Sequence, residues 1–119
     1  MPAPDDREDP VEVVYCTCPD NPTAARIAQA LVAERLAACV NLLPGLRSFY
    51  RWEGAVHDDP ETLLIIKTCL SRIDALTQRI QALHPYDVPE VLAVPANGGL
   101  PEYLGWVSDS TRAATAGRG

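Results

Sequence analysis

The segment from His84 to Glu90 gathers an imidazole, a phenol and two carboxylates within seven residues. Pro85 cannot continue a helix and disfavours helical geometry at His84, so a helix should end there. Pro89 fixes the backbone at the start of the next segment. Rigid connectors that carry polar groups are frequent positions for functional sites. The alternative is a plain helix-to-strand connection punctuated by two prolines, and the segment taken alone favours that alternative.

Cysteines are the second group of residues that could take part in chemistry. They occur at positions 16, 18, 39 and 69. None forms a C-x-x-C pair, and Cys16-Thr-Cys18 is too closely spaced for a structural zinc knuckle. Cys39 and Cys69 lie in apolar sequence and are interpreted as small core residues. A strand-end cysteine such as Cys16 is more often a core residue than a ligand.

Composition limits the classes of function. The 119-residue chain carries a net charge of −6, which argues against nucleic acid or an anionic membrane as a partner. Its longest apolar run, 63–66, is far too short to span a membrane. Residues 1–10 are acidic and proline-rich, unlike a signal peptide, and predict a disordered arm. We therefore expect a cytoplasmic protein with reduced thiols.

Hydrophobic patterning predicts alternating strands and helices. The predicted strands cover 11–18, 39–43 with a continuation over 47–53, 62–68 and 91–94. Helices are predicted from about Thr23 to Ala38 with Asn21 as N-cap, after an N-cap at Ser71, and from Pro101. Breaks are expected at 44–45, at a turn at 53–54, and at 58–60. Residues 11–110 form one domain, and 111–119 should be a frayed tail.

This β-α-β-β-α-β order with a terminal helix indicates an α+β, ferredoxin-like fold with two helices on one face of an antiparallel sheet. The predicted strands 62–68 and 91–94 are apolar on both faces, yet both long helices belong on one face. The other face therefore needs a cover. The hairpin around 47–57 is long enough to reach a neighbouring chain, so we expect an oligomer.

Seven short motifs, in order along the chain, resemble the CutA divalent-cation-tolerance family. They are Cys16-Thr-Cys-Pro-Asp20, Glu34-Arg-Leu-Ala-Ala-Cys39, Asn41-Leu-Leu-Pro-Gly45, Tyr50-Arg-Trp-Glu-Gly54, Lys67-Thr68, His84-Pro-Tyr86 and Pro89-Glu90. The resemblance spans residues 11–110. It implies a ferredoxin-like protomer in a homotrimer, an architecture similar to PII-type regulators, and a link to copper and other divalent cations.

The resemblance also implies a metal site. The ligands proposed in the family map to Cys16, His84 and Glu90. Leu83 departs from the family's pattern, because it stands where a first histidine of a His-His-Pro-Tyr segment would be. A thiolate with an imidazole suits copper or zinc, and Glu90 or water would complete the coordination. With one histidine missing, we expect weak binding of copper or another divalent cation.

Four further residues, Tyr50, Trp52, Lys67 and Tyr86, are predicted to line a cleft between subunits. Three functions compete: a trimeric metal-binding protein of metal tolerance, a PII-like regulator that binds a small anionic ligand in the cleft, and a structural or anchoring partner protein. An enzyme is not expected. A Cys16–His84 pair could form where the first strand and second helix end, but nothing in the sequence supplies an oxyanion hole.

Overall fold

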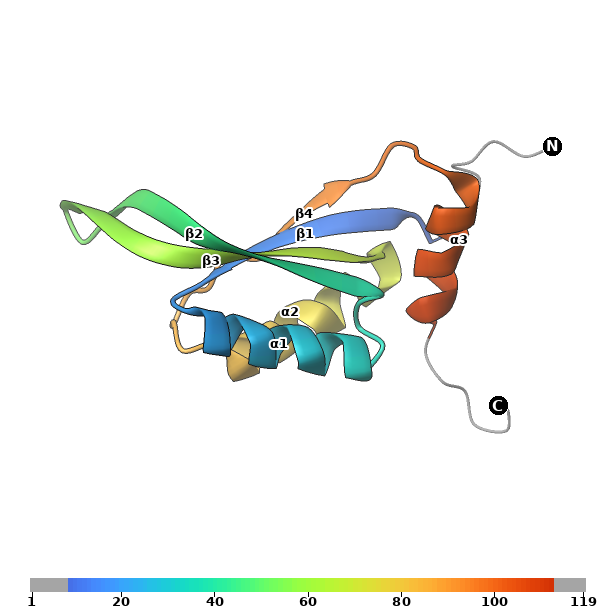
Figure 1. The fold of residues 1–119 in the computed structure, drawn as a ribbon, viewed down its shortest axis with the longest axis horizontal. Coiled ribbons are helices and arrows are strands. Elements are labelled where there is room, and N and C mark those ends of the chain that lie inside the picture. The colour runs from blue at the N-terminus through green and yellow to red at the C-terminus, as the bar shows by residue number, and fades with distance from the viewer. Residues whose placement is uncertain (1–8, 113–119) are drawn as a thin grey trace.

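The computed structural model describes residues 9–112 as a four-stranded antiparallel sheet with three helices (Figure 1). The strands are β1 (Val11–Cys18), β2 (Cys39–Trp52), β3 (Ala55–Cys69) and β4 (Leu92–Pro95), and the helices are α1 (Asn21–Ala33), α2 (Ile73–Leu83) and α3 (Pro101–Ser110). The sheet order is β2-β3-β1-β4. This confirms the ferredoxin-like α+β fold. Of the expected arm over 1–10 and the expected tail over 111–119, residues 1–8 and 113–119 lie outside the described residues. Asp9 accepts hydrogen bonds from Ser71, and Thr111 is buried at the end of α3.

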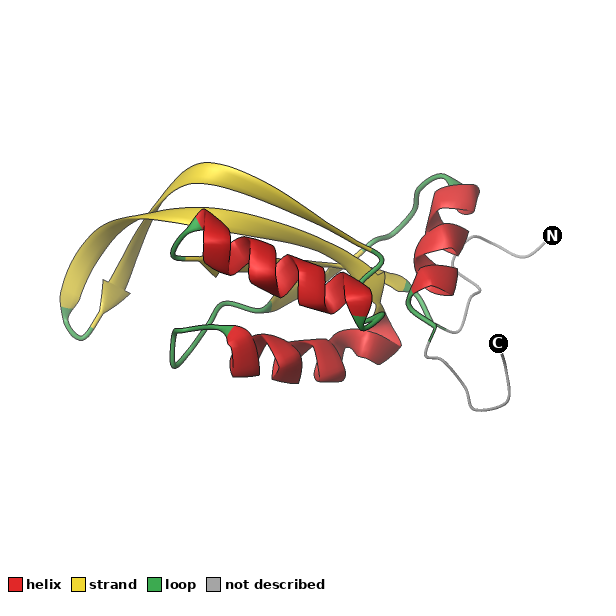
Figure 2. Cartoon of the chain, turned by 60° about the horizontal axis from the view of Figure 1, so that its bottom comes forward, coloured by secondary structure: helices red, strands yellow, loops and turns green. Residues whose placement is uncertain are grey.

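Helices α1 and α2 lie side by side on one face of the sheet (Figure 2). Their apolar stripes pack on the even-numbered residues of β1 and β3, which alternate toward that face. The core between them contains fully buried aliphatic side chains and two cysteines: Val14, Cys16, Cys18, Ile27, Leu31, Leu64, Ile66, Leu76 and Ile80. This layer holds the ends of β1 and α2 in fixed positions.

Helix α1 begins two residues earlier and ends five residues earlier than the sequence pattern predicts. Asp20, and not Asn21, is the N-cap, since its carboxylate accepts a hydrogen bond from the Thr23 N–H at 2.8 Å. The helix stops because Arg35 has a positive φ of 61°. The chain then turns back, and the Leu36 N–H donates to the Leu31 carbonyl.

The β2–β3 hairpin is longer and more continuous than predicted. The expected break at 44–45 is a bulge within β2, where Gly45 has φ 87° and the register shifts between Leu43 and Leu46. The expected break at 58–60 is also wrong, because these residues pair with β2 across the ladder. The turn at Glu53–Gly54 is confirmed, with positive φ at both residues.

Ser71 does not cap α2 as predicted. A 3₁₀ turn, η2 (Leu70–Arg72), comes first, and Ser71 instead donates from its N–H and hydroxyl to the Asp9 carboxylate. The other end of α2 agrees with the prediction. His84 follows the last helical residue in extended geometry (φ −83°, ψ 138°), as the residue before a proline should.

The face of the sheet opposite α1 and α2 is not covered within residues 9–112. The strand positions on this face are mostly apolar and half-buried or exposed: Val13, Tyr15, Leu43, Leu63, Ile65, Leu92 and Val94. The hairpin projects beyond the helices (Figure 1). It carries further large exposed side chains. No helix within 9–112 has the length and apolar character needed to cross a membrane.

One buried hydrogen bond ties the end of α1 to the sheet and predicts a measurable cost. The Thr68 hydroxyl is fully buried and donates to the Leu36 carbonyl at 2.7 Å. Thr68→Val keeps the shape but leaves that carbonyl without its donor, which should lower the free energy of unfolding by about 1–3 kcal/mol. Denaturant unfolding measures this. Thr77→Val, at a half-buried position on α2, is the control and should change stability by less than about 0.5 kcal/mol.

Candidate functional site

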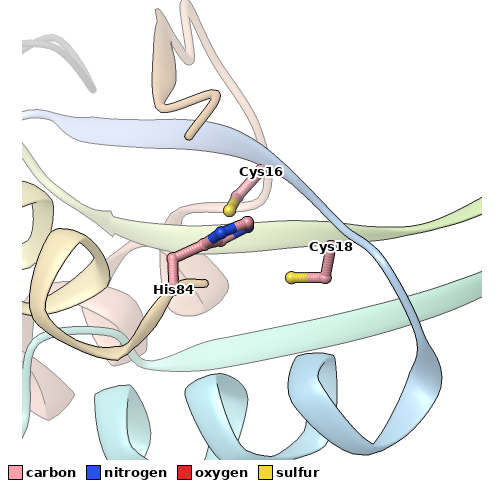
Figure 3. A group of neighbouring side chains, drawn as sticks. All are labelled: Cys16, Cys18 and His84. Carbon is pink, nitrogen blue, oxygen red and sulfur yellow. The ribbon is translucent and has the colours of Figure 1, made fainter. Parts of the chain in front are cut away.

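Strand β1 carries two cysteines on the same face. Because side chains alternate along a strand, Cys16 and Cys18 both point toward the helices, and Thr17 between them points to the other side of the sheet. Both cysteines are fully buried in the core, and Cys16 lies opposite Leu64 in the β1–β3 register. Figure 3 shows the two thiols on the helix side of β1.

His84 brings the end of α2 to these thiols. It is only 6% exposed, and its ring reaches β1 from the last turn of the helix (Figure 3). The Cys16 and Cys18 sulfurs and a ring nitrogen of His84 all lie within 4.8 Å of one another. The expected proximity of Cys16 and His84 is confirmed. Cys18 joins them, and we call these three residues the thiol–imidazole cluster.

Both ring nitrogens of His84 are engaged. Nδ1 accepts a hydrogen bond from the Tyr86 N–H at 3.1 Å, so Nδ1 carries no proton. Nε2 lies 2.8 Å from the Thr17 carbonyl oxygen, which can only accept, so Nε2 holds the proton and donates. The neutral Nε2–H tautomer is therefore the one that the hydrogen bonds select.

The two thiols perturb one another. The hydrogen bond with Cys18 raises the pKa of Cys16, and burial raises it further, with added repulsion from Cys18 and from the Glu90 and Glu61 carboxylates. The same hydrogen bond lowers the pKa of Cys18. Cys16 therefore holds its proton more tightly than an ordinary thiol.

A cavity of about 580 Å³ lies at the same end of β1. It is formed by the hairpin, the end of the sheet and the connector after α2, and we call it the hairpin cavity. Its lining residues are Thr17, Ser48, Phe49, Tyr50, Trp52, Glu61, Tyr86, Asp87, Val88 and Glu90. Three of these are carboxylates, four are aromatic, and none is a lysine, arginine or histidine.

Glu61 organises the polar side of the hairpin cavity. It is 8% exposed, and its Oε2 accepts a hydrogen bond from the Tyr86 hydroxyl at 2.9 Å. Burial and this hydrogen bond to Glu61 raise the pKa of Tyr86, which therefore stays protonated and donates. Burial and the charge of Glu61 also raise the pKa of Glu90. The hydroxyl of Tyr50 donates to Asp59 nearby on β3.

The residues predicted from the sequence divide between two places. Cys16 and His84 belong to the thiol–imidazole cluster, and the predicted cleft residues Tyr50, Trp52 and Tyr86 line the hairpin cavity together with Glu90. Lys67 does not line it. Its ammonium donates to the Asn41 side chain on the uncovered face of the sheet.

Sequence reasoning missed two residues, Cys18 and Glu61. The spacing of Cys16 and Cys18 contains the signal, because positions i and i+2 of a strand share a face. Glu61 offers no local signal, since its importance depends on Tyr86, 25 positions away, donating to it.

Comparison with known proteins gives a consistent result. Residues 12–110 match the family described as CutA1 divalent ion tolerance protein. A divalent-cation tolerance protein CutA from Thermus thermophilus is 52% identical over 100 residues, which is 84% of this chain and 97% of that protein. A chloroplastic CutA 1 from rice is 52% identical over 103 residues, 87% of this chain, but this chain spans only 58% of the rice protein.

The solved structures show the same fold. A Thermus thermophilus divalent cation tolerance protein superposes with a TM-score of 0.85 at 51% identity, covering 86% of this chain and 99% of that chain. A rice CutA1 crystal structure gives a TM-score of 0.85 at 51% identity, covering 88% and 96%. With the fold, the motifs and the matched residues in agreement, this chain belongs to the CutA1 divalent ion tolerance family.

Proposed function

We propose that this protein is a homotrimeric metal-binding protein of divalent-cation tolerance, and that it binds copper or a similar soft cation at the thiol–imidazole cluster. The observation that carries the proposal is the convergence of Cys16, Cys18 and His84 within 4.8 Å. Thiols and an imidazole suit copper and zinc, whereas magnesium and calcium prefer oxygen donors. Such a cation, when bound, would replace the thiol protons as the partner of the sulfur atoms.

The donors fit a metal at a cost. Donor atoms around one tetrahedral ion with bonds near 2.3 Å are about 3.8 Å apart, so the cluster must contract slightly to share an ion. His84 must also release one of its two hydrogen bonds before a ring nitrogen can coordinate. Each such loss costs about 1 kcal/mol. These costs support the weak binding expected from the sequence.

Glu90, the third ligand implied by the family resemblance, supports the site in another way. It lies near enough to Cys16 for its charge to raise the pKa of that thiol. Cys18 is the third donor that joins Cys16 and His84 in the compact group, so we assign Glu90 the role of a nearby counter-charge. Glu90 as a direct ligand stays a prediction of the resemblance.

The charge of the hairpin cavity argues against the alternative of a PII-like regulator. Anion sites use basic side chains, helix N-termini or glycine-rich turns. Among the described residues the cavity walls hold three carboxylates and no basic side chain. A phosphate-bearing ligand would be repelled there.

Catalysis by a Cys16–His84 pair is also unsupported. A nucleophilic cysteine requires a lowered thiol pKa, and the pKa of Cys16 is raised. His84 cannot serve as its base while Nδ1 accepts from Tyr86 and Nε2 donates to Thr17. The comparisons agree to the extent that the matched family is named for tolerance of divalent ions.

The uncovered sheet face supports the trimer. Leu92, Val94 and Leu43 are exposed on it, and the hairpin adds Phe49 and Val56. Contiguous exposed apolar surface of this kind is rare on monomers and typical of permanent interfaces. An anchoring partner protein, the third alternative, would need a different protein to cover the same surface.

Removing any one donor should weaken metal binding. In Zn²⁺ titrations by calorimetry, we expect the dissociation constant to be about tenfold larger, or more, for Cys16→Ser, Cys18→Ser and His84→Gln. Each substitution removes one bond to the ion. Cys39→Ser is the matched control, since Cys39 is only half-buried and outside the cluster. Equal isotherms for the parent and Cys16→Ser would exclude the thiol from the site.

Metal affinity should rise with pH. Cys16 must lose its proton to bind, and its pKa is raised, so the proton competes with the metal throughout the ordinary pH range. We therefore expect tighter Zn²⁺ binding at pH 8 than at pH 6, with net proton release into the buffer. Calorimetry in two buffers of different ionisation enthalpy measures that release. An affinity independent of pH, without proton release, would mean that no thiol ionises on binding.

The trimer should depend on the hairpin. Light scattering should give about three times the 12.9 kDa mass of the chain. Trp52 is 51% exposed in the single chain, and we expect it to be buried by a neighbour. Trp52→Ala should then weaken assembly by about 3–5 kcal/mol, seen as a lower mass on dilution. Val32→Ala, on the exposed side of α1, is the control. A monomeric parent would rule the trimer out.

A further inference from the structure

The hairpin cavity holds negative charge that the chain itself does not neutralise. The ion pairs within residues 9–112 are Arg47–Asp58, Arg79–Glu34 and Arg112–Asp109, and none reaches the cavity carboxylates. Glu61 is more than nine-tenths buried, and the hydrogen bond found for its carboxylate in this part of the chain comes from the neutral Tyr86 hydroxyl. A buried carboxylate is costly without a cation beside it.

The walls of the cavity indicate what kind of cation would fit. Tyr50, Trp52 and Tyr86 line it beside Glu61 and Glu90. Aromatic faces attract organic cations, and carboxylates accept hydrogen bonds from ammonium groups. A volume of about 580 Å³ is far larger than a metal ion and lies in the range of small-molecule sites.

We propose that the hairpin cavity binds an organic ammonium ion, a primary amine or diamine, with its ammonium group on Glu61 and Glu90 and its carbon chain against Tyr50 and Tyr86. The site is distinct from the thiol–imidazole cluster in its donors, because it offers carboxylate oxygens and aromatic rings where the cluster offers two sulfurs and an imidazole. The inference does not depend on metal binding at the cluster.

An N–H-bearing cation fits better than the two obvious competitors. A hard divalent metal needs about six oxygen ligands, and the aromatic walls supply few. A quaternary ammonium ion could lie on the rings, but it has no N–H to satisfy the buried Glu61 carboxylate. A primary ammonium ion has three N–H donors, which serves two carboxylates at once.

Calorimetric titration with 1,4-diaminobutane tests the proposal, with EDTA present to remove metals. The full-length protein should bind 1,4-diaminobutane saturably, and 1,4-butanediol, the neutral analogue of equal length, at least about tenfold more weakly. Glu61→Gln keeps an acceptor for Tyr86 but removes the charge, and it should weaken diamine binding about 10- to 100-fold. Glu90→Gln should act in the same direction. Glu53→Gln, at the hairpin turn outside the cavity, is the control and should bind like the parent.

The outcomes separate this inference from the metal proposal. Cys16→Ser should bind the diamine unchanged, whatever it does to zinc. Absence of saturable diamine binding would overturn the inference and would fit a cavity filled by a basic side chain of a neighbouring chain. Equal affinity of the parent for the diol and the diamine, or parent-like diamine affinity in both glutamate variants, would overturn it as well. Light scattering on each variant confirms that its mass equals that of the parent.

Discussion

The hydrogen bond from His84 Nε2 to the Thr17 carbonyl is the contact on which both candidate sites depend. It joins the end of α2 to the end of β1 and places the imidazole beside Cys16 and Cys18. Through Nδ1 the same ring accepts from the Tyr86 N–H and so fixes the connector. Tyr86 in turn donates to Glu61 on β3. His84 thus holds the thiol–imidazole cluster together, and through Tyr86 it also positions Glu61 in the hairpin cavity.

Features of the fold that depend on neighbouring residues in the sequence could be predicted, whereas features that depend on contacts distant in the sequence could not. Strand β1 and the end of α2 at His84 follow from local rules of alternation and of the residue before proline, and both agree with the structure. The end of α1 does not, because Arg35 adopts a positive φ that its residue type disfavours and that the turn back to β2 imposes. The sequence predicts a break at Gly45, but long-range pairing with β3 continues the strand on both sides of the bulge.

The residues of the candidate site also divide into those that the sequence could predict and those that it could not. Cys16 and His84 could be paired in advance because the fold class brings the ends of β1 and α2 together. Glu61 could not be identified, because its burial and its bond to Tyr86 exist only after the hairpin and the connector have packed. Lys67 shares the uncovered sheet face with Glu61, but it pairs with Cys39 at the start of β2, away from the hairpin, and donates to Asn41. A motif gives the residue types, and the position along the strand decides which end of the sheet each one reaches. A place for Lys67 in a cleft between subunits stays a prediction.

The electrostatics of this end of the molecule favour the proposed binding of cations over a nucleophilic role for Cys16. The hydrogen bond with Cys18 and burial raise the pKa of Cys16, and the charges of Glu90 and Glu61 add to that shift. Burial, followed by the charge of Glu61, raises the pKa of Glu90. The negative charges that disfavour a thiolate here would attract a cation, because Coulomb energies change sign with the charge. Buried carboxylates near a thiol therefore weaken a nucleophile and strengthen a cation site. In this chain that balance supports the two proposed cation sites, at the sulfur atoms for a soft metal and at the carboxylates for an ammonium group.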